Sequence, residues 1–340
     1  MLWTSLKVEV EMIFSIAIIS LLFAILLWIY QRLQYFKDCN IPFVKSLPLL
    51  GAFSDTLLNK CGVYDNVIKI YNDLDVKNSP FFGILMFHKP TLIVNDPILI
   101  KNILKKDFNS FSNRHTCSHE NDPLGYFMLF NVKSPLWKKL RGKMSLFFKS
   151  GNMKSMYYIL QNISNNLNKY VNDNLNDKGI VELEMKELSA LYATDVVATA
   201  AFGVDAKSLQ NPNGAFRKAG NAIFKMTTFR GFEFTSFFML PEIAKLFRFE
   251  FFSRKGTELI QSTIKNGMEE REKSGERKED LIDILIDVKK SEMSLSDNEK
   301  LTTEMLLSQG ATFFAGGFET SSATMSFALY EICKNVRKII

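Results

Sequence analysis

The chain has 340 residues, enough for one large domain or two of ordinary size, and its formal net charge is +6. It contains no block of Arg and Lys interleaved with aromatic residues, which argues against a nucleic-acid-binding protein. The four cysteines form no C-x-x-C pair and no disulfide framework, so a reducing compartment is favoured for Cys39, Cys61, Cys117 and Cys333.

The N-terminal stretch from Met12 to Tyr30 carries no charged residue. As a helix it would be about 28 Å long, close to the thickness of the hydrocarbon core of a bilayer. A cleaved signal peptide is the alternative, but its apolar region would be shorter and a small-x-small cleavage site should follow it. More basic residues follow the stretch than precede it. We therefore expect residues 1–11 in the lumen, a transmembrane anchor over residues 12–30 and the rest in the cytosol.

A proline-containing hinge is predicted over residues 31–51, because Pro42 and Pro48 stiffen the chain before Gly51. Residues 52–340 then form the remaining domain. Two strands joined as a hairpin are expected at Phe81–Phe87 and Thr91–Val94. A helix should follow, capped by Asp96 with Pro97 at its first position.

The rest of the chain is helical in pattern, so the fold class is mainly α with a small β-sheet. The predicted helices are Ser134–Lys149, Ser155–Asn174, Met185–Phe202, Ala215–Thr227, Ser253–Lys273, Asp280–Lys289 and Thr302–Lys334. The segment Thr227–Phe252 is unusually rich in phenylalanine and also carries basic residues. It is either ordinary core or an aromatic loop that dips into the membrane interface, and the pattern alone does not decide.

The helix predicted to begin near Ser134, as N-cap, and Pro135, at its first position, places Trp137 and Arg141 four residues apart on one face. An indole N–H and a guanidinium beside an apolar stripe could clamp a carboxylate. A cation–π pair or plain packing is the alternative and is favoured on spacing alone. The lysines around this helix are either a solvated face or a docking surface for an acidic partner: Lys138, Lys139, Lys143 and Lys149.

Two further patterns bear on chemistry. His115, Cys117 and His119 could share a metal ion, but the surrounding turn residues and the lack of a second ligand cluster argue against it. In the long last helix, Gly316 and Gly317 would open a flat groove beside the acid and hydroxyl of Glu319–Thr320. That pair could relay protons, with the hydroxyl bonded to the carbonyl four residues back. A small-residue packing notch is an equally good reading.

Together these motifs resemble those of the cytochrome P-450 superfamily of haem-thiolate monooxygenases, of the microsomal insect type that handles xenobiotics. Trp137 and Arg141 match its W-x-x-x-R, and Gly316 to Ser321 match its [AG]-G-x-[DE]-T-[TS]. Asp107 to Arg114 is similar to the segment before its substrate-covering loop. The resemblance implies the cytochrome P-450 fold.

The same resemblance implies site roles. Glu319 and Thr320 would be catalytic, serving oxygen activation and proton delivery. Trp137 and Arg141 would bind a propionate of haem b, with Gly316 and Gly317 beside the macrocycle. The substrate pocket would be lined by Phe313, Phe314, Phe318 and His115, and the Phe-rich segment would face the membrane as the substrate entrance.

The resemblance further implies insertion of one oxygen atom from O2 into lipophilic substrates such as xenobiotics, hormones and insecticides. Electrons would come from NADPH through a separate reductase, with cytochrome b5 as a second electron donor, at the endoplasmic reticulum membrane. The family's E-x-x-R and its cysteine loop do not occur in the 340 residues, and Cys333 lacks the loop setting of the iron ligand. We therefore expect a fold incomplete at its C-terminus and a chain inactive as given. The alternative is a membrane-anchored, non-catalytic product that binds lipophiles or the reductase.

Overall fold

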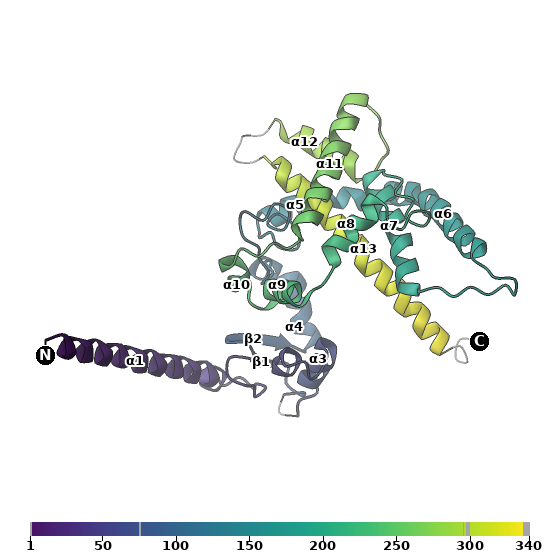
Figure 1. Cartoon of the computed structure of the whole chain (residues 1–340). Coiled ribbons are helices and arrows are strands. Elements are labelled where there is room, and N and C mark those ends of the chain that lie inside the picture. Colours follow the sequence, from purple (N-terminus) through teal and green to yellow (C-terminus); the bar gives the residue numbers. More distant parts are fainter. Residues whose placement is uncertain (1, 75, 295, 297–299, 336–340) are drawn as a thin grey trace. The chain divides into compact units, whose positions relative to one another are not determined.

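The computed structural model describes residues 2–74, 76–294, 296 and 300–335, which fall into two compact units, residues 1–112 and 113–340. The fold is mainly helical with a small sheet, as predicted (Figure 1). The first unit contains α1 (Leu2–Asp38), α2 (Ser54–Leu57), α3 (Val63–Tyr71), β1 (Phe81–Met86), β2 (Lys89–Val94) and α4 (Pro97–Lys101). The second contains α5 (Leu136–Met144), α6 (Ser150–Asp173), α7 (Met185–Phe202), α8 (Ala215–Phe224), α9 (Thr228–Met239), α10 (Pro241–Leu246), α11 (Arg254–Ser274), α12 (Leu281–Glu292) and α13 (Thr303–Lys334).

Helix α1 carries the predicted anchor. Among the described residues, its part from Met12 to Asp38 is the helix that is long and apolar enough to cross a membrane, and its most apolar stretch is not buried inside the protein. The helix continues past Tyr30, where the apolar stretch ends. An apolar helix exposed along its length is consistent with a membrane anchor.

The proline hinge lies along the edge of β1. The N–H of Val44 donates to the carbonyl of Gly83 at 3.0 Å, and that of Ala52 donates to the carbonyl of Leu85 at 2.8 Å. Between them, Gly51 has a positive φ of 69°, and a side chain there would lie 2.2 Å from the Leu85 oxygen. These backbone hydrogen bonds attach the segment to the edge of β1, and its role as a hinge stays a prediction.

Helix α4 begins as predicted. The N–H of Leu99 donates to Asp96 Oδ1 at 2.7 Å, and Pro97 occupies the first turn. A π-helical turn at Asn102–Lys106 and a 3₁₀ turn at Phe108–Ser110 complete the first unit.

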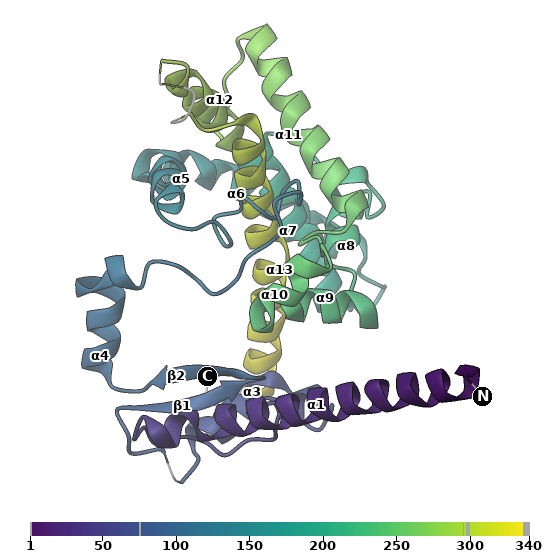
Figure 2. The same cartoon turned by 90° about the vertical axis from the view of Figure 1, so that its left-hand side faces the viewer.

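The second unit is built around α13, which crosses it from end to end with α7 packed along its length (Figures 1 and 2). Two glycines of α13 permit close packing of α11 and α7 against it. A side chain at Gly310 would lie 2.3 Å from Ile264 of α11, and one at Gly317 would lie 2.5 Å from Val197 of α7. The absence of side chains at these positions therefore lets neighbouring helices approach closely.

Most helix boundaries follow the predicted ones within three residues, but α6 begins at Ser150, five residues before the predicted Ser155, and the start of α5 also differs. Helix α7 has the predicted bounds, with Gly203 in the left-handed conformation after its last residue. At α5, the prediction that Ser134 caps the helix and Pro135 is its first residue is wrong. The helix begins at Leu136 with no side-chain cap, and the Lys133 carbonyl accepts the N–H of Trp137 at 2.9 Å.

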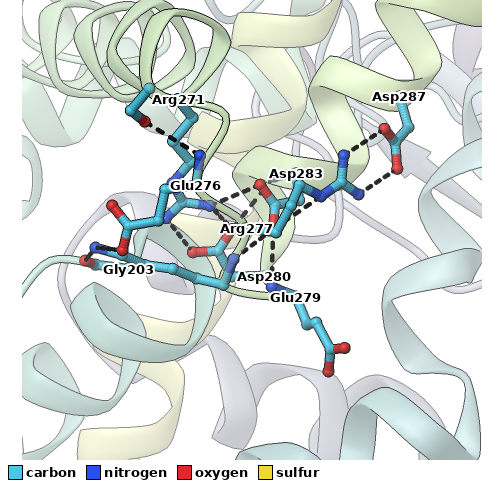
Figure 3. A network of polar contacts seen from close by, with 10 residues as sticks. Gly203, Arg271, Glu276, Arg277, Glu279, Asp280, Asp283 and Asp287 are labelled. Carbon is cyan, nitrogen blue, oxygen red and sulfur yellow. Dashed lines mark hydrogen bonds and ion pairs between the residues drawn. The ribbon is translucent and has the colours of Figure 1, made fainter.

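A buried network of charges joins α11 to α12 (Figure 3). The Arg271 guanidinium donates to both oxygens of Asp280 at 2.5 Å and to Asp283 at 3.0 Å, and all three side chains are buried. Burial alone lowers the pKa of Arg271, but the hydrogen bonds and charges of the two aspartates outweigh it and raise that pKa. Gly203 borders the network, since a side chain there would lie 2.2 Å from Arg271. Arg277 extends it to Asp287 with two hydrogen bonds of 2.6 and 2.7 Å.

Candidate functional site

Helix α5 presents Trp137 half-buried against the main core and Arg141 one turn later in solvent. Among the described residues, the Arg141 guanidinium has no hydrogen bond or ion pair and lies over no aromatic ring. The cation–π alternative is therefore not what the structure shows for this pair. Arg141 is a free cation beside an apolar helix face, and such a group can bind an anionic ligand.

The end of α5 meets α13 close to the two consecutive glycines. A 3₁₀ turn, Ser145–Phe148, extends α5 and places the rings of Phe147 and Phe148 at 4.8 and 5.6 Å from the ring of Phe313. Phe313 precedes Gly316 by about one helical turn. The 3₁₀ turn that follows the W-x-x-x-R helix therefore contacts the glycine-acid-threonine helix, which is far from it in sequence.

Gly316 and Gly317 face different surroundings. Apart from the adjoining backbone of α13 and the neighbouring residues, no described atom lies within 4 Å of the position that a side chain on Gly316 would occupy, whereas Gly317 packs against Val197. The flat groove expected from both glycines is thus open at Gly316, and Gly317 is a packing notch. The hydroxyl of Thr320 donates to the Gly316 carbonyl, so the predicted bond to the residue four positions back is confirmed.

Glu319 and Thr320 open onto two different grooves. Thr320 and Gly317 line a groove of about 510 Å³ between α6, α7 and α13, together with Tyr192. Glu319 lines a second groove of about 480 Å³ on the other side of α7, which also contains Arg217. Successive helical residues point about 100° apart, so this divergence follows from helix geometry.

The carboxylate of Glu319 has a fixed cationic partner. Lys186 Nζ, at the start of α7, donates to Glu319 Oε1 at 2.8 Å and to Ser322 Oγ at 2.7 Å. Both members of the ion pair remain about two-fifths exposed, so solvent reaches them. The acid is therefore held in one orientation at a wet surface, an arrangement that suits proton exchange with bulk water.

The three phenylalanines around the glycines of α13 differ in burial. Phe314 and Phe318 are each 1% exposed and stack on each other with ring centres 5.6 Å apart. Phe318 also stacks on Phe224 of α8 at 5.4 Å. Phe313 is only half-buried. Their predicted place in a substrate pocket stays a prediction, with Phe313 the member that still offers free surface.

The loop that carries His115 is ordered by its own polar side chains. His115 is exposed, whereas His119 is buried and neither of its ring nitrogens has a hydrogen-bond partner. The buried carboxylate of Asp122 accepts hydrogen bonds from Ser118 Oγ at 2.5 Å and from the N–H of Phe251 at 2.9 Å. Asp122 therefore ties this loop to the end of the Phe-rich segment. Within the described residues, no three His, Cys, Asp or Glu side chains are placed to hold a metal ion.

The Phe-rich segment forms α9 and α10, and it is core in part, while its contact with a membrane stays a prediction. Phe237 and Phe252 are buried in the main core. Phe229, Phe232 and Phe247 are more than half exposed. One segment therefore supplies both core packing and an exposed aromatic surface.

Two of the lysines around α5 are engaged within the chain. Lys139 and Lys143 contact the buried carboxylate of Glu292, at the end of α12, at 2.5 and 3.2 Å. The N–H of Leu301 donates to the same carboxylate at 3.1 Å. A docking surface for an acidic partner would therefore depend on Lys138 and Lys149, which remain exposed.

The Glu292 carboxylate gives a pH-dependent contribution to stability. Burial raises its pKa, but hydrogen bonds from Lys139, Lys143 and the Leu301 amide, with the Lys139 charge, lower it below the ordinary value. A carboxylate whose pKa is lowered in the folded state stabilises that state above the unfolded pKa of about 4.3. This stabilisation is lost as the pH falls through the pKa of the folded state. We expect Glu292→Gln to flatten the fall in the free energy of unfolding below about pH 4.3 in urea titrations. An unchanged slope would contradict this assignment.

Sequence reasoning missed Lys186 and Asp122. Both act through partners more than a hundred residues away, Glu319 and Phe251 respectively. No local pattern identifies such a pair. The turn signal Asn121-Asp122-Pro123 did mark an ordered turn, but not the residue that its carboxylate would bind.

Cys333 lies far along α13 from the Gly316 opening. Cys333 is exposed and lies on α13 about 25 Å beyond Gly316. Cys117 lies in the His115 loop, with its sulfur 3.9 Å from the Pro241 carbonyl. The structure therefore gives Cys333 no place beside the groove.

Comparison with known proteins agrees with these motifs. The family model described as cytochrome P-450 matches residues 43–337. The chain is 36% identical over 334 residues to probable cytochrome P-450 6g2 of Drosophila melanogaster, covering 96% of this chain and 64% of that protein. It is 36% identical over 329 residues to cytochrome P-450 6k1 of Blattella germanica, covering 92% and 62%. The chain thus spans somewhat over three-fifths of the length of these relatives. On this match and on the two motifs that α5 and α13 carry, the chain belongs to the cytochrome P-450 family.

Proposed function

We propose that this chain is part of a membrane-anchored haem monooxygenase that inserts one oxygen atom from O2 into lipophilic substrates. The observation that carries the proposal is the meeting of α5 and α13, where the rings of Phe147 and Phe148 contact Phe313. This contact supports placing the free Arg141 and the open face at Gly316 in one region of the second unit. The family match supports the same activity.

The residues of this region fit haem. A planar apolar macrocycle needs an open face without side chains, and Gly316 provides one. Its propionates need cationic or N–H donors, and Arg141 and Trp137 provide them on one face of α5. Bound haem supplies the oxygen chemistry itself, while the protein supplies binding, orientation and electrostatics. We assign no cysteine of the described residues to the iron.

Glu319 and Thr320 then serve proton delivery from opposite sides of the α7–α13 contact. Glu319 exchanges protons with solvent while Lys186 holds its orientation. The Thr320 hydroxyl donates to the Gly316 carbonyl, so its lone pairs remain available to accept a hydrogen bond at the open face. Phe313 bounds that face on the side where the substrate would lie.

The proposal includes partners and location. Electrons would come from NADPH through a separate flavin reductase, with cytochrome b5 as a second donor, at the endoplasmic reticulum membrane. The exposed Phe229, Phe232 and Phe247 would face the bilayer and admit lipophilic substrates such as xenobiotics or insecticides. The apolar, unburied stretch of α1 supports membrane attachment.

The test is oxygen incorporation. The protein encoded by the natural transcript is co-expressed with the reductase in microsomes and supplied with 7-ethoxycoumarin and ¹⁸O-labelled O2. We expect NADPH-dependent incorporation of one labelled oxygen atom that carbon monoxide inhibits. Haem bound at full occupancy without any such incorporation, across a panel of lipophilic probes, would overturn the proposal.

Arg141 gives a direct test of the haem site. Arg141→Leu keeps the size of the side chain but removes the charge, and a hydrogen bond to a charged group contributes about 1.5–3 kcal/mol. We expect haem binding to weaken, with a dissociation constant for haem roughly 10- to 150-fold higher, measured by transfer to apomyoglobin. Arg254→Leu, at an exposed position of α11, is the control and should leave haem affinity unchanged. Equal affinities in both variants would remove Arg141 from the site.

A further inference from the structure

The groove of about 480 Å³ that contains Glu319 lies where α7, α8 and α13 meet (Figure 1). Its volume is in the range of small-molecule sites, which is about 300–1,000 Å³. One face of α8 contributes four lining residues at helical spacing: Arg217, Asn221, Phe224 and Lys225. The other walls come from α7 and α13: Lys186, Glu187, Ala190, Phe318 and Glu319. The groove therefore combines charged, amide and aromatic surfaces.

Arg217 is held in this groove by packing. Its side chain is 4% exposed, and its guanidinium carbon lies 5.2 Å from the ring centre of Phe318. Gly220 permits this arrangement, because a side chain there would lie 2.3 Å from the same ring. The cation is therefore placed by α8 and α13 together, and it is not an arginine that extends into solvent.

The Arg217 guanidinium has more donors than partners. Its Nη2 donates to Glu187 Oε2 at 2.6 Å. Its Nε is buried, and neither Nε nor Nη1 has a hydrogen-bond partner among the described residues. The Glu187 side chain is 50% exposed, so water competes with Arg217 for it. Burying a cation with unfilled donors is costly, and an anion in the groove would reduce that cost.

The charges that line the groove do not cancel. Lys186 pairs with Glu319. Arg217 pairs with Glu187, which leaves Lys225 as the third cation of the lining. Lys225 is exposed, and no carboxylate in the described part of the chain pairs with it. Three cations face two carboxylates, so the groove attracts one further negative charge.

Phe224 gives the groove an apolar wall next to its cations. Its ring is half-buried and stacks on Phe318 with ring centres 5.4 Å apart. Asn221 lies about one turn after Arg217 and one turn before Lys225, and its side-chain amide has no partner within the described residues. A ligand whose apolar body packs on Phe224 would therefore place an acidic group beside two donors, the Asn221 amide and the Arg217 guanidinium.

We propose that this groove binds a lipophilic monocarboxylic acid, with the carboxylate on Arg217 and Asn221 and the apolar body on Phe224. Lys225 adds attraction for the anion. A carboxylate suits this set because its oxygens accept hydrogen bonds from both donors, whereas a neutral ligand would leave the excess positive charge unbalanced. The inference rests on the lining of the groove and not on the monooxygenase proposal.

The test uses 2-naphthoate, an aromatic monocarboxylate, and 2-acetylnaphthalene as its neutral counterpart. Binding of each to the detergent-solubilised full chain is measured by equilibrium dialysis. Asn221→Asp introduces a like charge beside the proposed carboxylate, at an exposed position. Asn266→Asp is the matched control, because it makes the same change at an exposed position of α11 that does not line the groove.

We expect the chain to bind 2-naphthoate, and Asn221→Asp to raise the dissociation constant by about tenfold or more, because repulsion replaces a hydrogen bond to a charged group. Asn266→Asp should change it by less than about twofold, since exposed charges far from the ligand are screened. Arg217→Lys keeps the charge but loses the planar fork, and it should weaken binding severalfold while circular dichroism shows an unchanged fold. The neutral 2-acetylnaphthalene should bind more weakly and equally to the chain and both Asn→Asp variants.

Three results would overturn the proposal. If 2-naphthoate does not bind, the groove does not take this class of acid. If Asn221→Asp binds it as the unchanged chain does, the acid binds elsewhere. If Asn221→Asp and Asn266→Asp weaken binding equally, the effect is one of overall charge and not of this groove. None of these measurements depends on monooxygenase activity.

Discussion

Arg271→Met is expected to lower the free energy of unfolding by about 3–5 kcal/mol, because it leaves buried carboxylates without their cation. Arg271, Asp280 and Asp283 are 7%, 2% and 1% exposed, so water cannot replace the lost partner. The guanidinium binds both oxygens of Asp280, and no other side chain of the described residues does so. Urea unfolding of the detergent-solubilised chain, followed by circular dichroism, measures the change.

The control for this prediction is Arg254→Met. Arg254 and Glu258 form an ion pair of 3.3 Å on the same helix, with side chains 85% and 66% exposed. Exposed pairs contribute little, so this change should stay within about 0.5 kcal/mol. Adding Asp280→Asn to Arg271→Met should recover part of the loss, because it removes one of the unpaired charges. Equal effects of the two arginine substitutions would show that burial of the network does not determine its contribution.

Much of the helical fold was predictable from the sequence because its signals are local. Helix α7 ends at Phe202 because Gly203 follows it in the left-handed conformation. The start of α13 follows from Thr302, whose hydroxyl accepts the N–H of Met305 at 3.3 Å. The predicted start of α5 was wrong because Ser134 does not cap the helix. The backbone carbonyl of Lys133 accepts the N–H of Trp137 instead. The connection between the His115 loop and the end of the Phe-rich segment depends on the hydrogen bond between Asp122 and Phe251, which no local pattern predicts.

The features of the candidate site likewise fall into those that local sequence patterns predict and those that depend on distant residues. The spacing of Trp137 and Arg141, and the bond from Thr320 to Gly316, follow from helix periodicity and were predictable. The different surroundings of Gly316 and Gly317 were not, because they depend on which helix packs against each glycine. The same holds for Glu319, whose partner Lys186 comes from α7.

Glu319→Gln is expected to lower the rate of oxygen incorporation by about 10²-fold or more, the contribution typical of a group that transfers a proton in the rate-limiting step. The amide keeps the shape of the side chain and can still accept a hydrogen bond from Lys186, so folding and haem content should not change. Because Glu319 acts on protons and not on substrate binding, the effect should fall on kcat, with KM little altered. Product formation from 7-ethoxycoumarin in reductase-containing microsomes measures it.

Two further variants separate the chemistry of Glu319 from its position. Glu331→Gln changes an exposed acid that lies twelve residues after Glu319 on α13, and it should leave the rate unchanged. Lys186→Met removes the cation that orients the Glu319 carboxylate, and we expect a smaller loss, roughly tenfold, that Lys186→Arg restores in part because a guanidinium can make the same hydrogen bond. If Lys186→Met abolished activity as fully as Glu319→Gln while haem content stayed normal, the lysine would itself belong to the proton path. If neither variant lowered the rate, solvent would reach the Gly316 face without help from this ion pair, and Thr320 would be the group to test next.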